Sequence, residues 1–162
     1  MDIYRFLDEH DIEYERHDHP PVFTCEEAER LVPPMPGART KNLFVYNKKE
    51  ERHFLVVVEC ETVVDLKSLA AKLSVNKLAL ASQERLKRFL DLDPGAVTIL
   101  GLVNDVGGDV EVIMDEELWE SDSFRCHPLV NTSSLVIARE DIKRFIDITG
   151  HRVRILDIPR KG

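Results

Sequence analysis

The chain has 162 residues, of which 43% are hydrophobic and 32% are charged, a balance typical of one globular domain. Its formal net charge of −8 argues against a protein that binds double-helical DNA or an anionic membrane, because both favour a broad basic face. No apolar run reaches the length of a membrane span, and no secretory signal is visible, so we expect a cytoplasmic protein. The three cysteines form no C-x-x-C pair, and we expect their thiols to be reduced.

Capping side chains and apolar patterns predict short elements in the first half of the chain. Four helices are expected to begin after a residue that can cap a helix N-terminus: Asp2, Thr24, Asp65 and Ser82. The expected strands are alternating or apolar runs at residues 12–16, 43–46, 54–58 and 78–80. The run at 54–58 is continuous and rich in valine, which is typical of a central strand buried on both faces.

The second half of the chain is expected to add strands and a long helix. The strands are predicted at residues 97–103, 110–114, 134–138 and 153–156. Gly101 interrupts the first of these, and the turn at 105–109 is expected to join it to the next strand as a hairpin. Residues 124–131 are expected to be irregular, and a helix over 139–149 should end at Gly150. Because helices and strands interleave irregularly, the sequence predicts a mixed α/β sheet.

The segment Thr40-Lys41-Asn42 is a candidate for function. It follows the breaker run at residues 33–37 and leads into a β-type apolar run, which places Lys41 at the mouth of a strand. A lysine there can direct a cation and three hydrogen-bond donors into a cleft. Taken alone, however, the pattern more often describes a solvated lysine beside a core strand.

Three other places contain candidate site residues: Gly101 with Asn104, His127, and Asn131. A glycine within an apolar strand often marks a bulge or a close approach by a ligand, and its N–H could stabilise an oxyanion; a bend that only serves packing is the alternative. His127 precedes a proline, which favours an extended backbone and fixes the direction of the ring. A histidine satisfied by backbone groups is equally compatible with this position.

Other chemistries lose support. Cys126 and His127 are neighbours, and adjacent side chains of extended chain point to opposite faces, so a Cys–His catalytic pair is not expected. His17 and His19 could share a strand face, but no third metal ligand follows at a recognisable spacing. The chain lacks G-x-G-x-x-G, P-loop, H-E-x-x-H and G-x-S-x-G motifs. We therefore expect no metal ion and no cofactor.

Six segments, taken in order, resemble the YbaK/prolyl-tRNA editing domain family of aminoacyl-tRNA deacylases. They are residues 40–44, 63–67, 80–86, 94–98, 101–105 and 127–132. The resemblance spans about residues 20–150. It is closest to the freestanding, alanine-removing members, because Asp105 stands where cysteine-removing members carry a proline and Asn104 lies in the same loop.

The resemblance implies a single domain over residues 1–162 with a mixed, partly closed β-sheet surrounded by helices. It implies that Lys41 orients the 3′ end of the tRNA and that the Gly101 loop stabilises the oxyanion. It also implies that the remaining candidates bind the substrate: Thr40, Asn42, Asn104, His127 and Asn131.

The expected activity is trans-editing hydrolysis of the ester of mischarged tRNA(Pro), with Ala-tRNA(Pro) as the expected substrate. The partner is the tRNA 3′ end, and prolyl-tRNA synthetase or an elongation factor are candidate transient partners. Three alternatives remain open: a Cys-tRNA(Pro) deacylase, a non-catalytic module that binds a tRNA end or a nucleotide, and a metal hydrolase that uses His17, His19 and His127.

Overall fold

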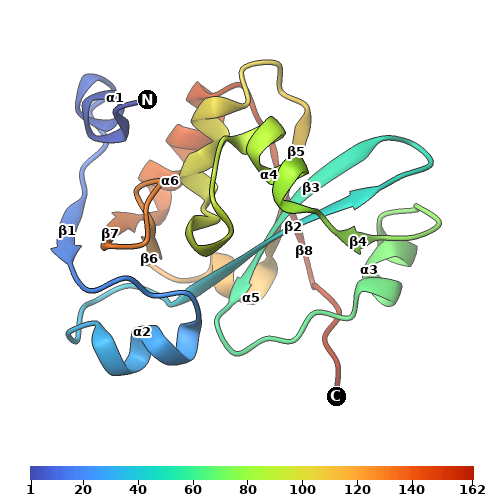
Figure 1. Ribbon diagram of the computed structural model, residues 1–162, viewed down its shortest axis with the longest axis horizontal. Coiled ribbons are helices and arrows are strands. Elements are labelled where there is room, and N and C mark those ends of the chain that lie inside the picture. The colour runs from blue at the N-terminus through green and yellow to red at the C-terminus, as the bar shows by residue number, and fades with distance from the viewer.

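The computed structural model describes residues 1–162 (Figure 1). Its strands are β1 (Glu15–Asp18), β2 (Thr40–Asn47), β3 (Arg52–Glu59), β4 (Ala79–Leu80), β5 (Val110–Asp115), β6 (Ser123–Cys126), β7 (Ser133–Ala138) and β8 (Val153–Leu156). Its helices are α1 (Ile3–Glu9), α2 (Cys25–Leu31), α3 (Leu66–Lys72), α4 (Gln83–Leu90), α5 (Glu116–Trp119) and α6 (Arg139–Ile148), with 3₁₀ helices η1 (Pro94–Ala96) and η2 (Ile99–Asn104). No helix is long and apolar enough to cross a membrane.

The strands form two sheets. The larger has the order β4-β2-β3-β5-β8, in which β4, β2 and β3 pair antiparallel and β3, β5 and β8 run parallel. The smaller is antiparallel, with the order β1-β7-β6. The mixed α/β class is therefore confirmed. The single sheet expected from the sequence is divided in two, and one parallel bridge between Ala38 and Phe124 joins the parts.

Strand β3 is the centre of the molecule, as its apolar run predicted. Its residues point alternately to the two faces of the larger sheet. Leu55 and Val57 pack into a core of 24 buried residues on one face, whereas Val56 and Val58 pack into a core of 12 on the other. Burial on both faces explains why the strand lacks the polar alternation of a surface strand.

The four helix starts predicted from capping residues are confirmed. The side chains of Asp2, Thr24, Asp65 and Ser82 each accept a hydrogen bond from a backbone N–H in the first turn of the following helix. Such a cap typically stabilises a helix by about 1 kcal/mol. Three of these helices bury apolar side chains, but α2 buries none, so its position depends on other contacts.

The strand predicted at residues 97–103 is wrong. This segment contains η2, which Thr98 caps by accepting a hydrogen bond from Leu100 N–H at 3.2 Å. Ile99 to Val103 are all buried, so the run has no polar face. A short run that is apolar on every side does not distinguish a strand from a buried helical turn.

Two further predictions in this half of the chain are corrected. The turn at 105–109 does not form a hairpin, because β5 pairs in parallel with β3 and β8. The segment 124–131 is not irregular throughout, because its first residues belong to β6, which pairs with β7. The strand expected at 12–16 begins later, as β1 at Glu15.

Candidate active site

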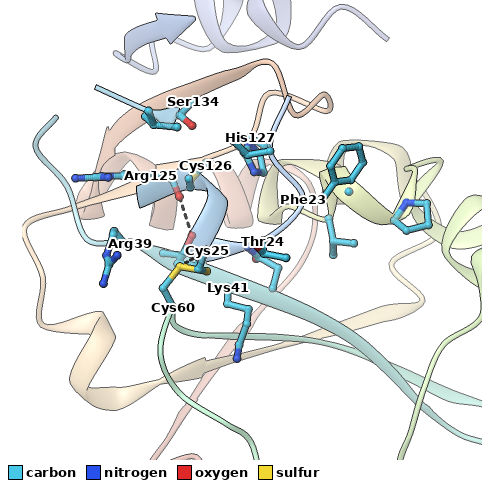
Figure 2. A pocket seen from close by; sticks show the side chains of 18 residues that line it. Phe23, Thr24, Cys25, Arg39, Lys41, Cys60, Arg125, Cys126, His127 and Ser134 are labelled. Atoms are coloured by element: carbon cyan, nitrogen blue, oxygen red, sulfur yellow. Dashed lines mark hydrogen bonds between the residues drawn. A yellow bond between two sulfur atoms is a disulfide. The ribbon is translucent and has the colours of Figure 1, made fainter. Parts of the chain in front are cut away.

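A cavity of about 420 Å³ opens beside the start of β2 (Figure 2). Its walls come from the turn before α2 and its first residues, from residues 39–42, from the η1 turn, and from the end of β6. The cavity therefore lies where the edges of the two sheets meet, at the opposite end of β2 from its pairing with β4 (Figure 1). Pockets of about 300–1,000 Å³ are typical of small-ligand sites.

The structure brings together four of the seven predicted site residues. Thr40, Lys41, Asn42 and His127 line the cavity. They come from segments more than 80 residues apart in the sequence. A hydrogen bond from Thr40 Oγ1 to the Arg125 carbonyl, at 2.7 Å, holds the start of β2 against β6.

Lys41 lies in β2, where it pairs with Val58 of β3. Its ammonium group donates a hydrogen bond to the carbonyl of Thr62, and Figure 2 shows the side chain directed away from His127. A backbone carbonyl is a neutral partner. An incoming anionic group can therefore replace it and gain a stronger, charge-assisted hydrogen bond.

Asn42 carries an unusual group: its Oδ1 is buried and has no hydrogen-bond partner. A buried acceptor without a partner costs about 1–3 kcal/mol. Such a group is rare in native structures and calls for an explanation, such as a ligand that supplies the missing donor. Among the cavity residues, Asn42 is therefore the clearest polar contact left for a substrate.

His127 has a defined tautomer. Its Nδ1 lies 3.1 Å from the Ser133 carbonyl, which can only accept, so Nδ1 carries the proton and Nε2 is an acceptor in the neutral ring. Burial lowers the pKa of His127, and the nearby His19 lowers it further, although the hydrogen bond to Ser133 opposes both. The ring is therefore neutral at pH 7, with Nε2 able to accept a proton.

Two potential nucleophiles, Cys126 and Ser134, lie in the cavity wall. Burial raises the pKa of the Cys126 thiol to about 12, so the thiolate is absent at neutral pH. Ser134 Oγ lies 2.8 Å from His19 Nε2, and His19 Nδ1 lies 2.9 Å from the Pro20 carbonyl. Ser134 and His19 are close enough to act as a serine nucleophile and its base. However, His19 Nδ1 contacts a backbone carbonyl, whereas the histidine of a catalytic triad contacts a carboxylate.

The other three predicted residues do not line the cavity. Gly101 is buried in η2, and its N–H donates to the Thr98 carbonyl at 3.0 Å, so it is not free to stabilise an oxyanion. Asn104 donates to the Leu90 carbonyl at 2.8 Å. Asn131 is closer: its amide donates to the Val22 carbonyl at 3.0 Å and supports one wall of the cavity from behind.

Asp105 next to Asn104 has a structural role. Its buried carboxylate accepts hydrogen bonds from the N–H groups of Asp109 and Val110, and His151 Nε2 lies 2.7 Å from Oδ2. These contacts join η2 to the start of β5 and to the end of α6. The two positions that favoured an alanine-removing protein in the sequence therefore lie outside the cavity.

The sequence did not reveal the role of Gly95. This glycine lines the cavity, and a Cβ built on it would lie 2.6 Å from Cδ1 of Phe23 and 3.1 Å from Nδ2 of Asn131. No side chain other than hydrogen fits there without movement of these neighbours. In the sequence, Gly95 stood out only as part of the resembling segment 94–98, because its contact with Phe23 joins segments about 70 residues apart.

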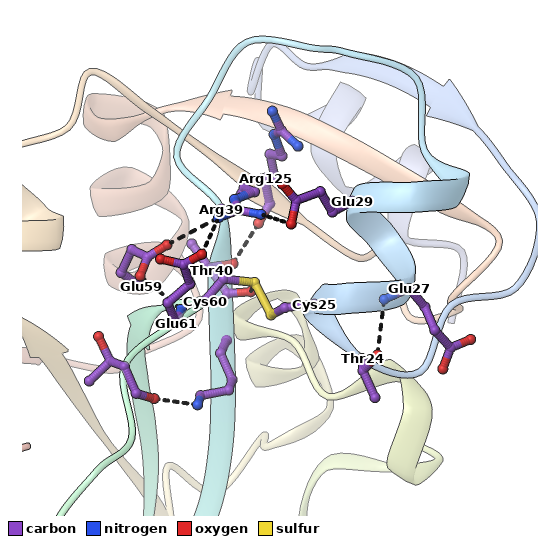
Figure 3. The surroundings of a disulfide bond; sticks show 12 residues. Thr24, Cys25, Glu27, Glu29, Arg39, Thr40, Glu59, Cys60, Glu61 and Arg125 are labelled. Atoms are coloured by element: carbon purple, nitrogen blue, oxygen red, sulfur yellow. Dashed lines mark hydrogen bonds and ion pairs between the residues drawn. A yellow bond between two sulfur atoms is a disulfide. The ribbon is translucent and has the colours of Figure 1, made fainter. Parts of the chain in front are cut away.

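The expectation of three reduced cysteines is wrong. Cys25, at the start of α2, and Cys60, directly after β3, form a disulfide in the cavity wall (Figure 3). Their sequence separation of 35 residues follows no spacing rule, so the pair could not be found from the sequence. Cys126 is the free cysteine.

Arg39 also holds α2 in place. Its guanidinium lies 3.4 Å from a carboxylate oxygen of Glu29 in α2, 3.4 Å from Glu61 and 3.8 Å from Glu59 (Figure 3). Three carboxylates thus surround this cation. Arg125 donates instead to the carbonyls of residues 35–37, and burial lowers its pKa.

Histidines and carboxylates do not gather into a metal site. No group of three or more His, Cys, Asp or Glu side chains is placed to hold a metal ion. His17 Nε2 lies 2.8 Å from Glu15, whereas the rings of His19 and His127 are 6.3 Å apart. The three histidines of the metal-hydrolase alternative therefore do not form a ligand set.

A small recess adjoins the main cavity behind Thr40, Asn42 and Cys126, which line both. Its volume is about 10 Å³. The rest of its wall is apolar: Val57, Ile99, Met114, Phe124 and Ile142. About 10–15 Å³ is the space that one water molecule needs, so the recess has room for no more than one very small group, and its lining favours an apolar one.

The chain matches the model of the aminoacyl-tRNA editing domain over residues 19–145. It therefore belongs to this family, which the six sequence segments predicted, and it is an aminoacyl-tRNA deacylase by class.

Individual relatives agree with this assignment. The chain is 34% identical over 152 residues to the prolyl-tRNA editing protein ProX of Acetoanaerobium sticklandii, covering 94% of this chain and 93% of the relative. It is 35% identical over 157 residues to prolyl-tRNA synthetase associated domain-containing protein 1 of Danio rerio, covering 96% and 85%. A crystal structure described as that of a candidate trans-editing enzyme for prolyl tRNA synthetase has the same fold, with a TM-score of 0.69 at 16% identity over 99% of this chain and 98% of the other.

Proposed function

We propose that the protein hydrolyses the ester of mischarged tRNA(Pro) in trans and that Ala-tRNA(Pro) is its main substrate. The observation that carries the proposal is that Lys41, Asn42 and His127 line one cavity, next to a small, mostly apolar recess that shares Asn42 with it. The tRNA identity is taken from the relative ProX, whose name specifies prolyl-tRNA editing. Such a protein acts where tRNA is charged, so we place it in the cytoplasm.

In the proposed reaction, water attacks the carbonyl carbon of the ester and the bond to the 3′ oxygen breaks. The oxygen takes up a proton, and free amino acid and tRNA are released. An aminoacyl ester is already activated, so positioning and charge stabilisation suffice and no protein nucleophile is needed. The buried Cys126 thiol, with its pKa near 12, agrees with this route.

Three polar residues of the cavity have a role in this mechanism. Lys41 leaves the Thr62 carbonyl and binds the anionic 3′ end of the tRNA. The unpartnered Asn42 Oδ1 accepts a hydrogen bond from the α-ammonium group of the amino acid. His127, neutral and unprotonated at Nε2, accepts a proton from the attacking water or from the neighbouring 2′-hydroxyl.

The η1 turn, not η2, provides the backbone that faces the ester. Gly95 lines the cavity, whereas the N–H of Gly101 is already bonded to Thr98. We therefore transfer the role of the oxyanion-stabilising backbone from Gly101 to the turn around Gly95. Asn131, bonded to the Val22 carbonyl, positions this wall, and Thr40 fixes the start of β2.

The recess accounts for the choice of alanine. A synthetase pocket built for proline discriminates against a smaller apolar side chain by only about 1–3 kcal/mol, so a second sieve is needed. A recess of about 10 Å³ has no room for a pyrrolidine ring, so a side chain directed into it can be no larger than a methyl group. Its apolar lining rejects the hydroxyl of serine only weakly, because a hydrophobic pocket does not exclude an added hydroxyl strongly.

The test is deacylation of four substrates at equal enzyme concentration: Ala-, Ser-, Cys- and Pro-tRNA(Pro). We expect fast hydrolysis of the alanyl ester, slower hydrolysis of the seryl ester, and little of the others. A preference for Cys-tRNA(Pro) would identify a cysteine-type deacylase. Activity on none of the four, together with retained tRNA binding, would identify a non-catalytic binding module.

A further inference from the structure

We propose that Phe23 is a stacking platform for the terminal adenine of the tRNA, so that the nucleoside that bears the ester is held by its base. This inference rests on the function proposed above. Phe23 lines the same cavity as Lys41 and His127, yet its side chain is 68% exposed. Figure 2 shows it at the edge of the cavity, on the side away from Arg39 and Cys60.

The exposure of Phe23 sets it apart from the other phenylalanines. The chain has seven, and each of the other six lies against another aromatic ring or an arginine. Phe23 has no such partner. Because burial of an aromatic ring is favourable, an exposed ring at the rim of a cavity indicates a surface that binds an apolar or aromatic group.

The backbone on both sides of Phe23 is fixed before any ligand binds. Val22 N–H donates to the Asn131 carbonyl at 3.2 Å, and the Asn131 amide returns a hydrogen bond to the Val22 carbonyl at 3.0 Å. On the other side, Thr24 caps α2 by accepting from Glu27 N–H at 3.1 Å. A ring held on such a backbone needs little further ordering when it binds, which lowers the entropic cost of association.

The ring also has support on one side. A Cβ at Gly95 would lie 2.6 Å from Cδ1 and 2.8 Å from Cε1 of Phe23, so the ring rests directly on the glycine backbone. Pro94 lines the cavity at the same place. With one side against the η1 turn and most of its surface exposed, the ring offers its remaining side to a flat ligand.

A nucleobase is the flat ligand that this position fits. In an aminoacyl-tRNA the base and the ester are attached to the same ribose. A base platform must therefore border the cavity that holds the ester, as Phe23 does. Stacking tolerates any base, and every tRNA ends in the same adenosine, so the contact adds affinity without selecting among tRNAs.

The experiment compares Phe23→Leu, Phe23→Trp and the wild type in deacylation of Ala-tRNA(Pro). Leucine keeps an apolar side chain but removes the π-face, whereas tryptophan keeps it. We expect Phe23→Leu to raise KM by about 5- to 150-fold, the range that a single stacked base contributes, with kcat little changed. Phe23→Trp should stay close to wild type. Leu80→Ala is the matched control, since Leu80 is 62% exposed and lies outside the cavity.

A second measurement does not depend on catalysis. The fluorescent adenine analogue 2-aminopurine riboside should be quenched by the wild type and by Leu80→Ala, and much less by Phe23→Leu. An active wild type whose Phe23→Leu variant has an unchanged KM and unchanged quenching overturns the platform while the deacylase function stands. A wild type that quenches the analogue but hydrolyses no ester overturns the function and leaves the platform intact.

Discussion

Removal of the Cys25–Cys60 disulfide should lower the stability of the protein by a predictable amount. The bond closes a loop with a sequence separation of 35 residues. In the chain-entropy model, a cross-link of this length restricts the unfolded chain by about 3–4 kcal/mol. Because α2 buries no side chain, the double variant Cys25→Ser/Cys60→Ser should keep both hydrophobic cores, and the loss should come from the unfolded state.

The assay is urea unfolding of the oxidised wild type and the double variant, with and without reductant. For a urea dependence of about 2 kcal/mol per M, the midpoint should fall by about 1.5–2 M. Reductant should shift the wild type to the position of the double variant and leave the variant itself unchanged. A loss below about 1 kcal/mol would refute the loop-closure argument and would mean that the bond does not restrict the unfolded chain.

Four further predictions concern the chemistry, each measured as kcat/KM on Ala-tRNA(Pro). Lys41→Ala should abolish most activity at unchanged thermal stability. Lys41→Arg should not fully restore the activity, because a planar guanidinium replaces a compact ammonium. Near wild-type rates for the folded Lys41→Ala variant would show that Lys41 is not part of the active site. Burial lowers the pKa of His127 from its usual value of about 6.5, so the ring is neutral at pH 7 and gains a proton only in acidic buffer. Activity should therefore be constant between pH 7 and 8 and fall as the buffer becomes acidic, and His127→Ala should lose this acidic limb. Cys126→Ser and Ser134→Ala should stay active, and loss of activity in either variant would establish a protein nucleophile. Activity should survive EDTA, whereas loss on chelation and recovery with zinc would establish a metal hydrolase.

Local chemistry made the elements on both sides of the site predictable. A capping side chain marks its own helix, as Thr24 does for α2, and the valine run of β3 reports burial on two faces. The η2 segment was mistaken for a strand because all of its apolar residues are buried, which removes the periodicity that separates the two structures.

The site itself was predictable only in part. Lys41 and His127 could be named because each stands beside a recognisable break in the chain, and the family resemblance joined them. The contact of Phe23 with Gly95 and the bond of Cys25 with Cys60 join distant segments, and no local pattern signals either. Gly101 was selected as a place where a ligand could approach closely, but the space left by its missing side chain is filled by Leu92.

The disulfide bears on how the cavity is closed in the cell. A reducing cytoplasm would act on this disulfide, so in the proposed location its reduction to a Cys25/Cys60 dithiol is the change to consider. Helix α2 would then be held by the Thr24 cap within its own first turn and by the Arg39–Glu29 ion pair, whose glutamate is mostly exposed. An exposed ion pair contributes about 0–1 kcal/mol, which is much less than a helix with a buried apolar face gains from packing. The start of α2 follows Phe23 directly and forms part of the cavity wall, so a helix without buried side chains lies beside the proposed base platform, whose own backbone is held through Val22 and Asn131. Reduction should therefore loosen the wall that admits the tRNA end while β2 and β6, joined by the Thr40–Arg125 hydrogen bond, keep Lys41 and His127 in place.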